Sequence, residues 1–157
     1  MDHASDCIFN FNQTSTESSQ TVEANHKLEP FAENCGASIR HYHADNKTFT
    51  SQAFKESYIA AQKTQSFCGV NAHHQNGVAE RKIKTVFSLA RTMLFAAITK
   101  WPNNIHVGLW SHVVYHAVDT LNNIPHSSGF TPKDIFTCVQ GASSFRHFHA
   151  FGSPSFV

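Results

Sequence analysis

Two carboxylates, Asp45 and Glu80, stand at positions where they could hold a metal ion. The run Ser38–Asn46 alternates like a short strand, and Asp45 follows where strand becomes loop. Glu80 lies near the start of a segment whose apolar spacing predicts a helix. Carboxylate oxygens suit Mg²⁺, and ions held between two elements can activate a hydroxyl for phosphoryl transfer. We therefore predict that the two acids converge as metal ligands and catalytic groups. Taken alone, Glu80 fits equally well as an acid that stabilises the start of its helix.

The helix that would carry Glu80 runs from Asn76 to Thr99. Asn76 is suited to cap it, because its side-chain oxygen can accept a free backbone N–H. Pro102 blocks continuation beyond Thr99. Apolar residues recur at intervals of three and four and predict one buried stripe, made of Ile83, Val86, Phe87, Ala90, Met93, Leu94 and Ala97.

Basic residues gather on this predicted helix, although the whole chain has a net charge of only +1. Between Asn76 and Lys100, five basic residues stand against one acid. A solvated helix face would explain this cluster, and so would contact with phosphates beside a metal-binding acid. The candidate nucleic-acid contacts are Asn76, Arg81, Lys82, Lys84 and Arg91.

The remaining patterns predict an α/β protein. We expect the strands Cys7–Phe11 and Ser38–His43 to pair, with a helix between them that Pro30 kinks or shortens and Gly36 ends. The other expected elements are the Gln20–Asn34 helix itself, a helix over Ser51–Gln62, a strand over Gln65–Cys68, a broadly apolar helix over Asn104–Asn123, a short helix over Thr131–Cys138, and a strand near the end of Gly141–Val157.

A series of motifs extends over most of the chain. They are His43-Ala44-Asp45-Asn46 with Phe49, the run Gly69–Arg81, Ala90–Leu94, Trp101-Pro102, Leu109-Trp110, Asn122–Pro125, Thr131-Pro132 and Phe148–Gly152. Together they resemble the catalytic core of copia-type retrotransposon integrases, which are DDE polynucleotidyl transferases with an RNase H-like fold. By that resemblance, Asp45 is the second catalytic acid and Glu80 the third.

The resemblance implies a mixed sheet flanked by helices, and DNA as partner, both retroelement ends and target. It also implies weakly bound Mg²⁺ or Mn²⁺, strand transfer as the reaction of the intact family, and a homo-oligomer. Residues 1–125 would form a partial core, and 126–157 the start of the region after it. The family's first Asp would precede Met1, and neither Asp2 nor Asp6 sits in its motif. Lys47 also replaces the usual Gly, which can reshape the turn after Asp45. We therefore expect an N-terminally truncated, catalytically defective core; the alternative is a non-catalytic remnant with weak DNA binding or no selected function.

Composition limits the other classes of protein. Four widely spaced cysteines without a secretory signal favour reduced thiols in the nucleus or cytoplasm. Cys68 with His73 and His74 fits no standard zinc spacing. No apolar run approaches the length of about 18 residues that a membrane span needs, so we expect no membrane association.

Overall fold

The computed structural model describes residues 1–15, 17–44, 52–60, 62–67, 77–141 and 148–154. The chain divides into two compact units. One is Phe11–Glu80; the other combines Met1–Asn10 with Arg81–Val157.

The unit Phe11–Glu80 begins with helix α1 (Ser18–Asn34). Pro30 does not shorten the helix, because the helix continues through this residue to Asn34. Gly36 ends it as expected: its positive φ of 76° lets its own N–H reach Glu33 O, at 2.9 Å, and the N–H of Ala37 reach Ala32 O.

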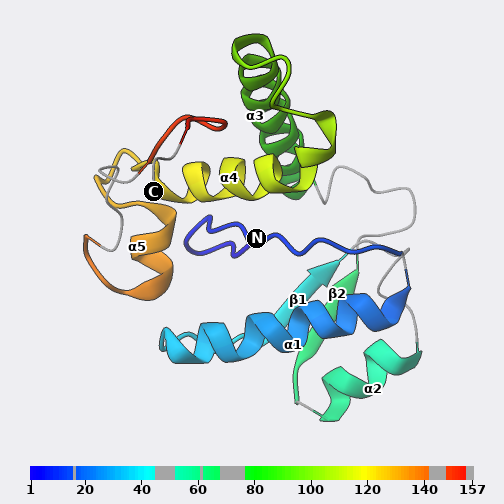
Figure 1. The fold of residues 1–157 in the computed structure, drawn as a ribbon. Helices are drawn as coiled ribbons and strands as arrows, with labels where there is room; N and C mark the ends of the chain where they lie inside the picture. The colour runs from blue at the N-terminus through cyan, green and yellow to red at the C-terminus, as the bar shows by residue number, and fades with distance from the viewer. Residues whose placement is uncertain (16, 45–51, 61, 68–76, 142–147, 155–157) are drawn as a thin grey trace. The chain divides into compact units, whose positions relative to one another are not determined.

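Strand β1 (His41–Ala44), helix α2 (Gln52–Ala60) and strand β2 (Thr64–Phe67) follow in order, and the strands pair in parallel (Figure 1). Parallel strands require a crossover, which α2 supplies. The expected alternation of β1 is confirmed, because His41 and His43 are exposed whereas Tyr42 is half-buried and Ala44 is buried.

Aromatic and polar contacts hold α1, α2 and β1 together. The rings of Tyr42 and Tyr58 meet edge to face, with centroids 5.0 Å apart. Glu29 on α1 accepts a hydrogen bond from the Tyr42 hydroxyl at 2.9 Å and pairs with Lys63 at 2.6 Å. Asn25 also donates to the Tyr58 hydroxyl. This unit therefore relies on a partly buried polar network as well as on apolar packing.

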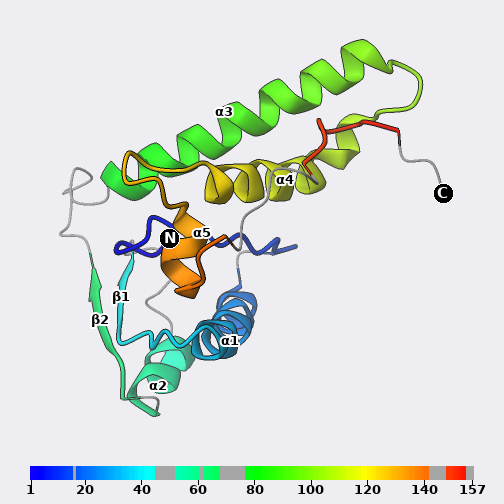
Figure 2. The same cartoon turned by 90° about the vertical axis from the view of Figure 1, so that its left-hand side faces the viewer.

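The second unit is built on helices α3 (Gly77–Lys100) and α4 (Trp110–Asn123), which Figure 2 shows running one above the other. A single hydrophobic cluster joins them, made of Val86, Ala90, Leu94, Val113, Val114, Ala117 and Val118. The buried stripe of α3 is narrower than predicted, because Ile83 is 54% exposed and Phe87 is 47% exposed. The predicted Asn104–Asn123 helix begins later, after the short 3₁₀ helix η2 (Val107–Leu109).

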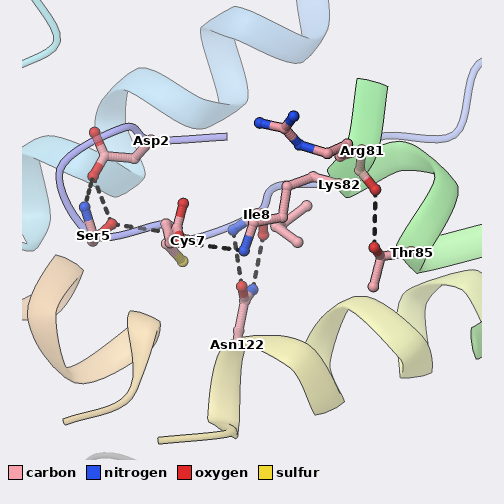
Figure 3. A network of polar contacts seen from close by, with 9 residues as sticks. Asp2, Ser5, Cys7, Ile8, Arg81, Lys82, Thr85 and Asn122 are labelled. Atoms are coloured by element: carbon pink, nitrogen blue, oxygen red, sulfur yellow. Dashed lines mark hydrogen bonds and ion pairs between the residues drawn. The ribbon is translucent and has the colours of Figure 1, made fainter. Parts of the chain in front are cut away.

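The N-terminal segment of this unit corrects the strand prediction. Cys7–Phe11 does not form a strand, and β1 pairs with β2 instead, so the expected helix-flanked mixed sheet is reduced to two strands among the described residues. The side-chain amide of Asn122 takes the place of a neighbouring strand. It accepts from Ile8 N–H and donates to Ile8 C=O, both at 2.8 Å (Figure 3).

Helix α5 (Pro132–Thr137) begins as predicted with Pro at its first position. Thr131 and Asp134 form a reciprocal capping box, in which Thr131 Oγ1 accepts from the Asp134 N–H at 3.0 Å. Cys138 ends the helix with a φ of 54°. The strand predicted near the end of Gly141–Val157 is absent from the described residues 148–154.

Candidate nucleic-acid and metal site

Glu80 lies in the first turn of α3, and its side chain is exposed. This position suits both interpretations from the sequence, since an acid there faces the positive end of the helix and also offers carboxylate oxygens to solvent. Asp45 and Asn76 lie outside the described residues. The convergence of Asp45 with Glu80, and the capping of α3 by Asn76, therefore stay predictions.

The described residues supply one member of the predicted metal site. Within them, no three His, Cys, Asp or Glu side chains gather closely enough to hold an ion. Glu80 is a hard oxygen donor of the kind that Mg²⁺ accepts. The chemistry of this donor therefore fits Mg²⁺, and the second ligand would be Asp45.

Helix geometry divides the basic residues of α3 between its sides. A turn of about 100° per residue places positions 80, 84 and 91 along one side. Lys84 and Arg91 are exposed there, together with Glu80. Arg91 lies four residues after Phe87 and four before Phe95, and Phe95 is 73% exposed. We call Lys84, Arg91 and Phe95 the exposed side of α3.

Lys82 projects from a different side of the helix. Its ammonium group lies 3.2 Å from Asp6 Oδ2, and both side chains are about one-third exposed. Arg81 is exposed, and its carbonyl accepts from the Thr85 hydroxyl (Figure 3). The sequence offered no signal for the ion pair, because Asp6 and Lys82 are 76 positions apart in the chain.

The two N-terminal acids have structural contacts. Asp2 Oδ2 accepts hydrogen bonds from the backbone N–H of Ser5 at 2.7 Å and from its hydroxyl at 2.5 Å (Figure 3). Asp6 pairs with Lys82 as described above.

Comparison with solved structures defines the fold. The HTLV-2 integrase catalytic core domain in complex with magnesium, in its trimeric form, has a TM-score of 0.60 and 21% identity, over 86% of this chain and 80% of that one. The dimeric form has a TM-score of 0.59 and 20% identity, over 86% and 79%. The chain therefore has the fold of retroviral integrase catalytic cores.

A third match is a chain of the simian T-cell lymphotropic virus intasome in complex with PP2A regulatory subunit B56 gamma. It has a TM-score of 0.58 and 16% identity, over 79% of this chain and 41% of that chain. No protein-family model matches the sequence, and no curated protein matches it significantly. None of the helices in the described ranges is both long enough and apolar enough to cross a membrane.

Proposed function

We propose that this chain is a copia-type integrase core that binds DNA through the exposed side of α3. Two independent lines support the proposal. The fold is that of integrase catalytic cores, and the motifs around Asp45 and Glu80 resemble those of the copia-type family. The observation that carries the DNA-binding part is the exposure of Lys84 and Arg91 on the side of α3 that also holds Glu80.

The exposed side of α3 suits phosphate and unpaired bases. Lys84 and Arg91 present positive charge at a spacing of two helical turns, and phosphate contacts need no sequence information. Phe95, beside Arg91, offers an exposed ring on which a base can stack. Arg81 adds a third exposed charge on an adjacent part of the helix. We therefore propose non-specific binding of duplex and single-stranded DNA.

Mg²⁺ or Mn²⁺ would be held by Asp45 and Glu80. Bound there, the ion would polarise a phosphodiester and steady charge on a leaving oxygen. The residues of this chain would bind the DNA backbone through Lys84 and Arg91 and place it near Glu80. By the resemblance, the 157 residues contain two of the family's three acids. We accordingly propose non-specific DNA binding beside a divalent-metal site, as part of an element whose cores integrate DNA at a target.

A salt titration tests the DNA-binding proposal. With Arg81, Lys84 and Arg91 each neutralising one phosphate, log K for a duplex should fall with log salt at a slope of about −3. The double variant Lys84→Ala/Arg91→Ala should reduce the slope by about 2 units, since each lost contact removes about 0.9. Lys55→Ala/Arg40→Ala is the matched control, because it removes one exposed lysine and one exposed arginine elsewhere. Equal effects of the two double variants would contradict the proposal.

The metal part needs its own measurement. Mn²⁺ binding, followed by electron paramagnetic resonance, should weaken in both Asp45→Asn and Glu80→Gln, because each removes one proposed oxygen ligand. Serine substitution of Glu17, an exposed acid just before α1, should leave it unchanged. Strand transfer with Mg²⁺ or Mn²⁺ that Glu80→Gln abolishes would show that Glu80 serves the reaction as well as metal binding.

A further inference from the structure

A polar cluster on the two-stranded sheet includes neither Asp45 nor any residue of α3. The register of β1 and β2 sets His41 opposite Thr64 and His43 opposite Ser66. Positions two apart on a strand share a face, so the four side chains lie together. Both histidines are exposed to solvent.

The hydrogens of this cluster can be assigned so that every contact is satisfied. Thr64 Oγ1 donates its hydrogen to Arg40 C=O at 3.2 Å, so it accepts from Nδ1–H of His41 at 2.7 Å. In a neutral imidazole the other nitrogen is then a lone-pair acceptor. Nε2 of His41 therefore receives the hydroxyl hydrogen of Ser66 at 2.8 Å, and Ser66 Oγ accepts from Nδ1 of His43, also at 2.8 Å.

Two features of this arrangement are those of a metal site. First, Nε2 of His41 and Nδ1 of His43 each lie 2.8 Å from the same atom, Ser66 Oγ. The two nitrogens therefore face one common point. Second, His41 donates its other N–H to Thr64, and metal-binding histidines almost always donate their second N–H in this way, which fixes the ring and the tautomer.

We propose that His41 and His43 bind a divalent transition-metal ion such as Cu²⁺, Ni²⁺ or Zn²⁺. Imidazole nitrogens suit these ions, whereas Mg²⁺ and Ca²⁺ require oxygen ligands. Metal–nitrogen bonds of about 2.0–2.1 Å require the two rings to turn toward each other, which their exposed position permits. The ion lies between Nε2 of His41 and Nδ1 of His43. The Ser66 hydroxyl keeps its hydrogen and turns it toward solvent, and the Nδ1 hydrogen of His43 is exchanged through solvent for one on Nε2. Ser66 and water complete the coordination.

The affinity should be modest, and its order among metals is diagnostic. Among the described residues no third His, Cys, Asp or Glu joins the pair, so this is not a closed structural site. Cu²⁺ should bind most tightly, ahead of Ni²⁺ and Zn²⁺, by the usual order for nitrogen ligands. A large excess of Mg²⁺ should not displace any of the three.

Within the described part of the chain, one other pair of histidines has a chelating spacing and must be distinguished. His112 and His116 lie four residues apart on α4. The ring of His116 is half-buried near the rings of Phe148 and Phe151, with centroids 6.2 and 5.9 Å away. Its position is thus set by aromatic packing, whereas His41 and His43 already share a hydrogen-bonding partner.

Calorimetric titration of the untagged, chelator-treated protein with Cu²⁺ tests the proposal, alongside electron paramagnetic resonance for nitrogen ligands. His43→Asn keeps the His41–Thr64 contact, yet it should weaken binding by roughly tenfold or more, because chelation by two linked groups is lost. Thr64→Val should also weaken it by roughly tenfold through loss of the outer hydrogen bond. The control His126→Asn/His149→Asn, which removes two exposed histidines, should not change the affinity.

The outcomes of these titrations distinguish the His41–His43 site from the other histidines. Loss of the two-nitrogen signal in His43→Asn, with the circular dichroism spectrum unchanged, supports the strand site. Full Cu²⁺ affinity in His43→Asn overturns it, as does the same loss in His112→Asn or in the control. DNA binding should remain intact in His43→Asn, so failure of this site is distinguishable from failure of the proposed function.

Discussion

Lys82 Nζ lies 3.2 Å from Asp6 Oδ2, which joins helix α3 to the N-terminal segment of the same unit. Lys82, which the sequence predicts to contact DNA, therefore also pairs with a carboxylate. Both side chains are about one-third exposed, so the pair contributes at most about 1 kcal/mol to stability. Its larger effect is on how much positive charge α3 offers to phosphate.

Lys82→Ala should therefore weaken DNA binding less than Lys84→Ala, although both remove one lysine from the same helix. We expect a change in salt slope of about 0.9 for Lys84→Ala and well below that for Lys82→Ala. Fluorescence anisotropy with a labelled duplex measures both. Asp6→Asn should strengthen binding slightly, because it releases Lys82. A greater loss in Lys82→Ala than in Lys84→Ala would contradict this division of α3.

Phe95→Ala should weaken binding of single-stranded DNA more than binding of duplex DNA. An exposed ring stacks on unpaired bases, and such stacking is worth about 1–3 kcal/mol per base. Ile59→Ala is a suitable control, since this residue is a large apolar side chain that is 75% exposed on another helix. Comparable losses for single and double strands would argue that Phe95 does not stack.

Asn122→Ala should destabilise the protein by about 1–3 kcal/mol, because it leaves the N–H and C=O of Ile8 without their side-chain partner. Urea denaturation followed by circular dichroism gives the change in unfolding free energy. Asn103→Ala, at an exposed turn, should alter it by about 0.5 kcal/mol or less. Similar stabilities for the two variants would mean that water replaces the Asn122 amide freely.

Glu29 should make stability sensitive to acid. Burial raises the pKa of this carboxyl, but hydrogen bonds from Lys63 and Tyr42 outweigh it and hold the pKa below the ordinary 4.5. The unfolded state then binds more protons in that range, so stability is present above about pH 4.5 and is lost as pH falls through the folded pKa. Urea midpoints at pH 7 and pH 3 should differ less in Glu29→Gln than in the wild type. An unchanged difference would remove Glu29 from the acid response.

Cys7 should produce the opposite dependence at high pH. Burial, with a further contribution from Asp2, raises the pKa of the Cys7 thiol from 9.0 to about 11. Between these values the unfolded thiol ionises before the folded one, so stability should decline from pH 9 to pH 11. Cys7→Ala should lessen that decline. In a labelling experiment at pH 8, the exposed Cys138 should react well before the buried Cys7.

Helices were predictable here because their signals are local. The apolar spacing, Pro132 and the Thr131–Asp134 capping box lie within single segments, and α3 and α5 begin within one or two residues of expectation. The Cys7–Phe11 segment looked equally strand-like, but its partner is the side chain of Asn122, more than a hundred residues away. Local pattern does not encode such a pairing, so alternation alone was misleading.

Local spacing also predicted only part of the candidate site. Spacing correctly placed Glu80 in the first turn of α3. It did not reveal that Asp6 pairs with Lys82, or that Ser66 lies between His41 and His43. Those relationships depend on the packing of the N-terminal segment and on the register of two strands.

The long separation between Ile8 and Asn122 also governs the order in which the protein can form. Contacts within β1–α2–β2 span a short stretch of chain and close small loops, which favours early formation. The amide that holds Ile8 lies 114 residues away, so this contact closes a far longer loop. During synthesis, residues 1–10 leave the ribosome before α4 does, so Ile8 must wait for α4 before it can contact Asn122. Until then Cys7, which is buried in the folded protein, stays accessible to oxidants and to other thiols.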